Sequence, residues 1–206
     1  MYARSITFHG DADRQDEGVD FVRDEVLPTT SRLDGCIGLS MVVDRDTGLS
    51  IVTSSWDSKE AMRASLPRLA NARLRGAEIL GATPELAEWE VAVMHRRHMV
   101  TAGACCRVTW LRVNHGDVER GIGIYRDAMI PEMESLAGFC SASLLVDREN
   151  GRACNTTVYD SAESLAASRE RSWAIRDAGL RDAGVDVLDV AECDVVVAHL
   201  RLPELV

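Results

Sequence analysis

The sequence has no uninterrupted apolar run of about 18 residues, so it predicts no transmembrane helix. Its first residues, Met-Tyr-Ala-Arg-Ser-Ile-Thr, begin a strand pattern and lack the apolar core of a signal peptide. Six cysteines are present, but they have neither metal-ligand nor paired spacing, and Cys105 and Cys106 are adjacent. Reduced cysteines and a cytoplasmic location are therefore expected.

Basic residues are scarce relative to acidic ones, since 23 Lys and Arg stand against 33 Asp and Glu, for a net charge of −10. A balance of this sign argues against nucleic acids and anionic membranes as partners. A glycine-rich phosphate loop is also missing, because Gly121-Ile122-Gly123 lies inside a helical pattern. No metal site and no cofactor are predicted.

What the sequence does contain is an internal repeat. When residues 18–68 are aligned without gaps with residues 121–171, an offset of 103 residues, 18 of 51 positions are identical. Unrelated sequences would match at roughly one position in fifteen, so the halves derive from one duplicated unit. Farther on, one extra residue brings His95 over His199. The predicted units are residues 1–95 and 106–206, joined by a linker over 96–105.

Each unit contains the same predicted order of elements. In the first unit, alternation predicts strands over 4–9, 37–43, 49–56 and 88–95, and helical spacing predicts helices over 18–33 and from 57 towards 80. Pro28 is expected to kink or end the first helix near residue 27, and Pro67 to break the second. Gly48 is expected at a positive φ in the turn between the middle strands. The second unit repeats this order, with strands over 106–113 and 187–200, a hairpin over 140–159, and helices over 117–136 and 161–182.

The order β-α-β-β-α-β is that of a ferredoxin-like unit. Four antiparallel strands with helices on one face leave the other face apolar and uncovered, and an equivalent sheet can cover it. The sequence therefore predicts an α+β protein of two tandem ferredoxin-like units, with sheets packed face to face as a pseudo-dimeric α+β barrel. The same pattern is compatible with a homodimer of the duplicated chain.

Several features of both halves resemble the antibiotic biosynthesis monooxygenase (ABM) type of dimeric α+β barrel. They are a mid-helix proline, a glycine that opens the second strand, an Asp-Arg turn and an aromatic residue followed by Asp-Ser. In this chain they are Pro28 and Pro131, Gly35 and Gly138, Asp44 and Asp147, and Trp56 and Tyr159. The resemblance covers nearly the whole chain, twice. It implies a pocket between the helices and the sheet of each unit. It also implies cofactor-independent oxygenation of hydroquinones or polyketide phenols, haem degradation, or ligand binding without known catalysis.

Two departures from this pattern bear on the choice of activity. Many relatives have a histidine about nine residues after the tryptophan that ends the third strand, where this chain has Ser65 and Ser168. Haem-degrading relatives have a tryptophan near that point and a histidine a turn or two later, where this chain has Arg73 and Arg176. The haem-ligand pattern is missing from both halves, so haem binding or degradation is the less favoured alternative.

Repeated side chains near the expected pockets are the candidates for substrate binding. Trp56 and Tyr159 could stack on a flat ligand, although an aromatic residue at this position also packs well as core. Paired arginines could fix a phenolate, although a solvated helix face with salt bridges is the simpler interpretation. The helical candidates are Ser65, Arg68 and Arg73 with their copies Ser168, Arg171 and Arg176.

His95 and His199 end the last strands of the two units and are the candidate catalytic residues. A histidine near a pocket mouth is suited to remove a phenolic proton as general base. A strand-end histidine is more often a surface residue or a hydrogen-bonded structural residue, so this alternative stays open.

Two functions are therefore expected. The first is cofactor-independent monooxygenation of a small aromatic ligand, such as a hydroquinone or a polyketide-like phenol, in a dry apolar pocket with hydrogen-bond donors for the substrate anion. The second is a non-catalytic small-molecule-binding or regulatory barrel. The missing histidines favour the second function, as does divergence between the halves at Trp56/Tyr159 and Val52/Asn155. An open pocket reached by His or Arg side chains would favour the enzyme.

Overall fold

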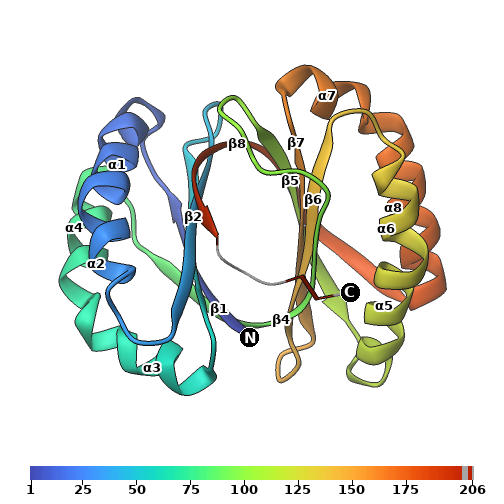
Figure 1. The fold of residues 1–206 in the computed structure, drawn as a ribbon, viewed down its shortest axis with the longest axis horizontal. Helices are drawn as coiled ribbons and strands as arrows, with labels where there is room; N and C mark the ends of the chain where they lie inside the picture. Colours follow the sequence, from blue (N-terminus) through green and yellow to red (C-terminus); the bar gives the residue numbers. More distant parts are fainter. Residues whose placement is uncertain (201–203, 206) are drawn as a thin grey trace. The chain divides into compact units, whose positions relative to one another are not determined.

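A computed structural model describes residues 1–200 and 204–205. Strands and helices follow the order strand, helical segment, two strands, helical segment, strand, and this order occurs twice (Figure 1). The strands are β1 (Tyr2–His9), β2 (Cys36–Asp44), β3 (Leu49–Trp56), β4 (Glu85–Arg96), β5 (Cys105–Val113), β6 (Phe139–Asp147), β7 (Arg152–Tyr159) and β8 (Val185–Leu200).

The first helical segment of each half changes geometry before its proline. Pro28 and Pro131 lie in the first turn of α2 and α6, where a missing N–H costs little. A π-helical turn precedes each of these helices, so the segment changes geometry close to residue 27 and does not end there. The pieces are α1 (Gln15–Phe21), the π-helical turn Val22–Val26 and α2 (Leu27–Thr30), and then α5 (Val118–Ile124), the π-helical turn Tyr125–Met129 and α6 (Ile130–Glu134).

The second helical segment of each half begins at a capping serine. The Oγ atoms of Ser58 and Ser161 accept hydrogen bonds of 3.2 and 3.1 Å from the backbone N–H three residues later. In the first half the segment breaks at Leu69, two residues after Pro67, as predicted. The helices are α3 (Lys59–Arg68), α4 (Ala70–Leu80), α7 (Ala162–Ala167) and α8 (Arg169–Ala183).

Antiparallel pairing builds the sheet of each half around a central strand. β3 lies between β1 and β2, and β7 lies between β5 and β6. Gly48 and Gly151, in the turns that lead into the central strands, have φ of 75° and 60°, as the turn chemistry predicted. The hydrogen-bonded strand order is closed, β1-β3-β2-β8-β5-β7-β6-β4. The fold is therefore α+β, with two βαββαβ-like halves that form a closed eight-stranded antiparallel barrel, which confirms the predicted class.

The chain divides into two compact units, and the long strands β4 and β8 contribute to both. The first unit holds Met1–Trp89 together with the end of β8 from Cys193, and the second holds Glu90–Glu192. The end of β8 pairs with β2, and the end of β4 pairs with β6. Each unit therefore includes a strand end from the other half of the sequence. The predicted boundaries 1–95, 96–105 and 106–206 describe the repeat and stay a prediction.

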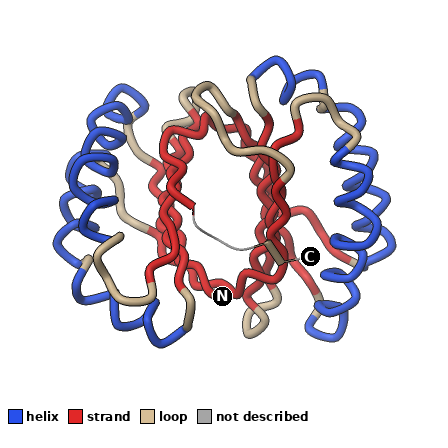
Figure 2. The backbone as a smooth tube through the Cα atoms, in the orientation of Figure 1, coloured by secondary structure: helices blue, strands red, loops and turns tan. Residues whose placement is uncertain are grey.

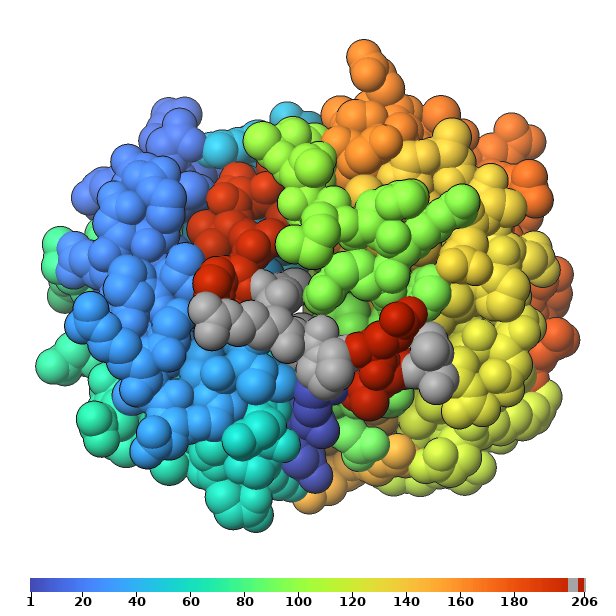
Figure 3. Space-filling view, in the orientation of Figure 1, coloured from blue at the N-terminus to red at the C-terminus, as the bar shows by residue number. Residues whose placement is uncertain are grey.

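In each unit the helices cover one face of the sheet, and the core lies between them (Figure 2). On the face drawn in Figure 3, side chains of α1 and α2 (blue) and of α5 and α6 (yellow) form the surface beside the strands of their own units. Within the described part of the chain, no helix is both long and apolar enough to cross a membrane.

Candidate functional site

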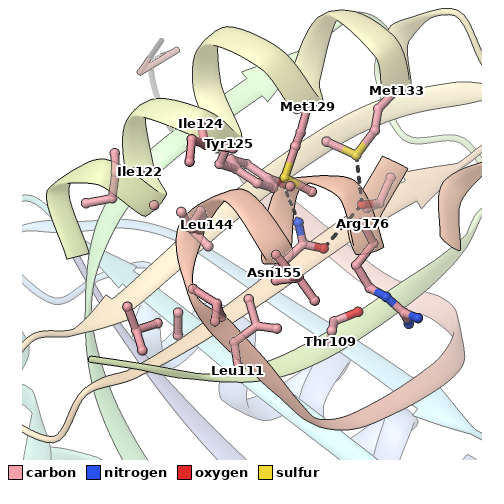
Figure 4. A pocket seen from close by; sticks show the side chains of 18 of the residues that line it. Thr109, Leu111, Ile122, Ile124, Tyr125, Met129, Met133, Leu144, Asn155 and Arg176 are labelled. Carbon is pink, nitrogen blue, oxygen red and sulfur yellow. Dashed lines mark hydrogen bonds between the residues drawn. The ribbon is translucent and has the colours of Figure 1, made fainter. Parts of the chain in front are cut away.

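The second unit contains a cavity of about 80 Å³ between its helices and its sheet. Side chains of β5, β6 and β7 line one side, and α5, the following π-helical turn and α8 line the other (Figure 4). Most of this lining is apolar, with residues such as Leu111, Ile122 and Leu144. A ligand inside would be largely shielded from water.

The first unit has an equivalent cavity of about 50 Å³. Most of its lining residues lie 103 positions before lining residues of the second cavity, as in the pairs Gly76/Gly179 and Arg73/Arg176. The duplication has therefore produced two pockets, at the position that the ABM resemblance implies.

Polar side chains distinguish the second cavity from the first. Four pairs of equivalent lining positions illustrate how the two cavities differ. At three of them an apolar side chain in the first cavity corresponds to a polar one in the second, and at the fourth a serine corresponds to the larger threonine. The pairs are Ile6/Thr109, Val22/Tyr125, Val52/Asn155 and Ser54/Thr157.

Three of these polar residues form a directed chain of hydrogen bonds across the second cavity (Figure 4). Thr157 Oγ1 donates to Asn155 Oδ1 (3.4 Å), and Asn155 Nδ2 donates to Tyr125 Oη (2.6 Å). Tyr125 Oη in turn donates to the backbone carbonyl of Ser143 (3.3 Å). Because Tyr125 uses one N–H of the Asn155 amide, the second N–H can donate to a ligand.

The hydroxyl of Tyr125 is a hydrogen-bonding group and not a base. Burial, together with the neighbouring Tyr159 and Cys154, raises the pKa of Tyr125 well above its usual value. The phenol therefore stays protonated at neutral pH and keeps the direction of the hydrogen-bond chain fixed.

Tyr159 also lines the second cavity and is fully buried. Among the described residues its hydroxyl has no hydrogen-bond partner. Trp56, the equivalent residue, is fully buried in the first unit, but its Nε1 donates to Ser54 Oγ (3.1 Å). A buried hydroxyl without a partner costs free energy, so a ligand that hydrogen-bonds Tyr159 would recover that cost.

Replacing Tyr159 with phenylalanine is expected to raise the free energy of unfolding of the ligand-free protein by about 1 kcal/mol, because it removes an unpaired buried hydroxyl and keeps the ring. The matched control, Tyr125→Phe, is expected to lower it by about 1 kcal/mol, because it leaves the Asn155 amide short of a partner. Urea titrations measure both changes. A loss of stability in both variants would contradict an unpaired Tyr159 hydroxyl.

The predicted arginines Arg73 and Arg176 each line the cavity of their own unit. The guanidinium carbon of Arg176 lies 6.0 Å from the centre of the Trp173 ring. Its Nε and Nη2 lie 2.9 and 2.8 Å from Asp177 Oδ1. Trp173, which the sequence patterns did not single out, lines the same cavity and is 43% exposed.

The other helical candidates lie outside the cavity linings. Ser65 and Ser168 are buried, and each hydroxyl donates to a backbone carbonyl three residues earlier (2.7 Å). Arg68 and Arg171 are exposed to solvent. A contact of these four residues with substrate stays a prediction.

The two strand-end histidines also lie outside the cavity linings. His95 Nε2 is 2.7 Å from Glu134 Oε1, Nδ1 is 2.7 Å from Glu204 Oε1, and the ring stacks on Phe139 with centroids 6.2 Å apart. His199 lies in β8 opposite Leu39 of β2. The role of either histidine as a base stays a prediction.

Two buried arginines that the sequence patterns did not single out hold equivalent positions. Arg4 Nη2 lies 2.8 Å from Glu88 Oε1, and Arg107 Nη2 lies 2.7 Å from Glu192 Oε1. Arg107 also lines the second cavity. The repeat in the sequence could have identified these pairs, because the two arginines match at an offset of 103 residues and the two glutamates at an offset of 104.

The described side chains do not form a suitable set of ligands for a metal ion or for haem iron. Within residues 1–200 and 204–205, no group of three or more His, Cys, Asp or Glu side chains could hold a metal ion. The described linings of both cavities also lack histidine, so neither offers the imidazole that commonly ligates haem iron.

A closed α+β barrel built from two βαββαβ-like halves, each with a cavity under its helices, defines the class of protein. The family model described as "Antibiotic biosynthesis monooxygenase" matches residues 1–67. This chain belongs to the ABM family. Two uncharacterised proteins of Mycobacterium tuberculosis are 46% and 44% identical to it across the whole chain, and the matches cover 92% and 88% of those proteins.

Solved structures share the fold at low sequence identity. A Lactobacillus acidophilus protein provisionally named as a monooxygenase has a TM-score of 0.71 and 11% identity, with 97% of this chain and 96% of that chain covered. An anthrone oxidase-like protein has a TM-score of 0.67 and 13% identity, with 99% and 93% covered. A haem-degrading enzyme of Listeria monocytogenes has a TM-score of 0.52 and 9% identity, with 93% and 98% covered. At sequence identities this low, the similarity to these structures shows a shared fold and no more.

Proposed function

We propose that this protein is a cofactor-independent monooxygenase that oxidises a small aromatic hydroxy compound in the cavity of its second unit. The observation that carries the proposal is the hydrogen-bond chain of Thr157, Asn155 and Tyr125, set in an otherwise apolar cavity beside the unpaired hydroxyl of Tyr159. Membership of the ABM family supports the oxygenase class.

The proposed reaction is the oxygenation of an anthrone or a hydroquinone by O₂. Loss of a phenolic proton from a hydroquinone, or of a methylene proton from an anthrone, gives an electron-rich anion, which transfers electrons to O₂ and then forms a carbon–oxygen bond. For an anthrone, one oxygen atom becomes a ring carbonyl, and the other leaves as water with the two hydrogens of the ring methylene. The substrate supplies all four electrons, so the reaction needs no external reductant.

The residues of the second cavity supply donors for the substrate oxyanion. The second N–H of the Asn155 amide and the hydroxyl of Tyr159 are the donors without a partner among the described residues. Tyr125 and Thr157 bind the two ends of the amide and fix its orientation. Donors held in place within an apolar site stabilise a developing anion more than water does.

Electrostatics favour the ionised substrate. Arg176 lines the cavity, and a cation near a phenolic hydroxyl lowers the pKa of that hydroxyl. The described lining contains no Asp, Glu or His side chain. We therefore assign no side chain of the cavity as base, and the substrate proton leaves to solvent at the exposed edge.

The described lining offers no Asp, Glu or His side chain to accept the substrate proton, which favours a second function, ligand binding without turnover. The protein would then hold the anionic form of an aromatic ligand through the same donors and protect it from water. The two functions share a ligand and differ in the consumption of O₂.

Oxygen uptake by chelator-treated protein tests the proposal. With dithranol or a naphthohydroquinone as substrate, we expect O₂ consumption at least about 10-fold above the rate without protein, since general enzymatic accelerations are far larger. We also expect one ¹⁸O atom from ¹⁸O₂ in the product. Binding without uptake would select the second function, and the absence of both binding and uptake would refute both.

A further inference from the structure

The second cavity opens to solvent beside an aromatic side chain. Trp173 on α8 lines the cavity and is 43% exposed, so its ring borders both the interior and the solvent. An aromatic ring at the edge of a cavity offers a flat apolar face that a ligand can cover. The ring is therefore placed to stack on the outer part of a flat ligand.

A cation lies next to that ring. Arg176 follows Trp173 by three residues on α8, and its guanidinium carbon lies 6.0 Å from the ring centre. The Arg176 side chain is 24% exposed and lines the cavity. Its contacts run through Nε and Nη2 to Asp177, which leaves Nη1 without a hydrogen-bond partner among the described residues.

The guanidinium of the other arginine of this cavity is already held by protein groups. Arg107 is buried and paired with Glu192, whose second oxygen accepts from Arg169. The carboxylate of Asp177, in contrast, is about half exposed, so water competes for it and its hold on Arg176 is weak. Arg176 is therefore the lining cation that can pair with an anionic group of a ligand.

We propose that Trp173 and Arg176 select aromatic ligands that carry a carboxylate next to the phenolic ring, with the ring stacked on Trp173 and the carboxylate paired with the Arg176 guanidinium. A planar fork of N–H donors matches a carboxylate through two parallel hydrogen bonds. The inference rests on the second cavity being the ligand site, as in the proposed function, and adds the substrate class.

The first unit supports this assignment as an internal comparison. Arg73 lines the first cavity at the position of Arg176, but Ala70 stands where the second unit has Trp173. The first cavity therefore has the arginine but lacks the aromatic ring beside it. Selection of an aromatic carboxylate is a property of the second unit, and Arg73→Gln is the matched control for Arg176→Gln.

Calorimetric titration of the full chain with 1-hydroxy-2-naphthoate and with 1-naphthol tests the inference. We expect the carboxylate to bind wild type about 10-fold more tightly, since a charge-assisted hydrogen bond at a partly exposed site contributes about that factor. Arg176→Gln should abolish the preference, because it should weaken binding of the carboxylate about 10-fold more than binding of 1-naphthol. Arg73→Gln should leave both affinities unchanged, and Trp173→Ala should weaken both by about 10-fold.

Asp177→Asn is expected to have the opposite effect on affinity for the carboxylate ligand, because it removes the protein carboxylate that competes for Arg176. It should strengthen binding of 1-hydroxy-2-naphthoate by about 3-fold and leave 1-naphthol unchanged. Equal affinities of wild type for the two compounds, or a preference that survives Arg176→Gln, would overturn the inference while the proposed oxygenation stands. Absence of binding by either compound, together with absence of oxygen uptake, would overturn both.

Discussion

Replacing Arg107 with alanine is expected to lower the free energy of unfolding by about 3 kcal/mol, because it removes a buried guanidinium with its hydrogen bonds and leaves Glu192 with the exposed Arg169 as its partner. Arg107 is almost fully buried, and its guanidinium binds Glu192, the carbonyl of Leu165 and the hydroxyl of Ser172. Glu192 is 29% exposed, so water cannot fully replace the lost arginine. Guanidinium chloride denaturation of the variant measures the loss.

A matched control acts on the same carboxylate. Arg169 Nη2 lies 2.6 Å from Glu192 Oε2, but the Arg169 side chain is 49% exposed. Exposed ion pairs contribute little, so Arg169→Ala should cost less than about 1 kcal/mol. Equal losses in the two variants would show that burial does not decide the strength of this cluster and would contradict the prediction.

The same cluster predicts a dependence of stability on pH. Burial raises the pKa of Glu192, but hydrogen bonds from Arg169 and Arg107 outweigh it, and the pKa lies below its usual value. A carboxyl with a lowered folded pKa contributes stability that is present above the unfolded pKa, about 4.3, and is lost as pH falls through the folded pKa. We expect this part of the stability to decline in wild type as pH falls below the unfolded pKa of about 4.3 and to be absent from Glu192→Gln.

Replacing Asn155 with valine is expected to lower the rate of substrate oxidation by about 100-fold, the effect of removing one preorganised donor to an oxyanion. Valine is the residue at the equivalent position of the first unit, Val52, so it fits a strand of this geometry. Tyr125 keeps its hydrogen bond to the carbonyl of Ser143. Steady-state oxygen uptake measures the rate, and a melting curve verifies the fold.

Val52→Ala is the control for the first cavity and is expected to change the rate by less than about 2-fold, because the proposed chemistry takes place in the second. A fall in rate that follows Val52→Ala and spares Asn155→Val would assign the activity to the first unit. A fall that follows replacement of His95 or His199, with neither histidine lining a cavity, would instead support the base role expected from sequence.

The repeat made most of the fold predictable. Positions such as Pro28/Pro131 and Gly48/Gly151 recur at one offset because they serve backbone geometry, which both halves need. The π-helical turn before each proline could not be predicted, because a single turn with i→i+5 bonds is too short to leave a recognisable periodicity of its own. The exchange of strand ends was also hidden, since β4 and β8 read as simple alternation whichever sheet they join.

The site was only partly predictable, because function resides where the halves differ. Identity between the repeats selected Arg176, Ser168 and Arg171 together, although only the first lines a cavity. Tyr125, Thr157 and Trp173 differ from their counterparts and so received no weight. Their proximity arises from three separate elements, and no local pattern reports the hydroxyl of Tyr159 that tertiary packing leaves unpaired.

The shared strands β4 and β8 determine what would happen if the peptide chain were cut between its two halves. If the peptide between residues 97 and 104 were cut, each fragment would carry a strand end that belongs to the unit of the other fragment. Neither fragment could then complete its own sheet, and the two would rebuild the fold only as a pair. One chain thus encodes an arrangement that two separate copies of the ancestral unit would reach by swapping strands.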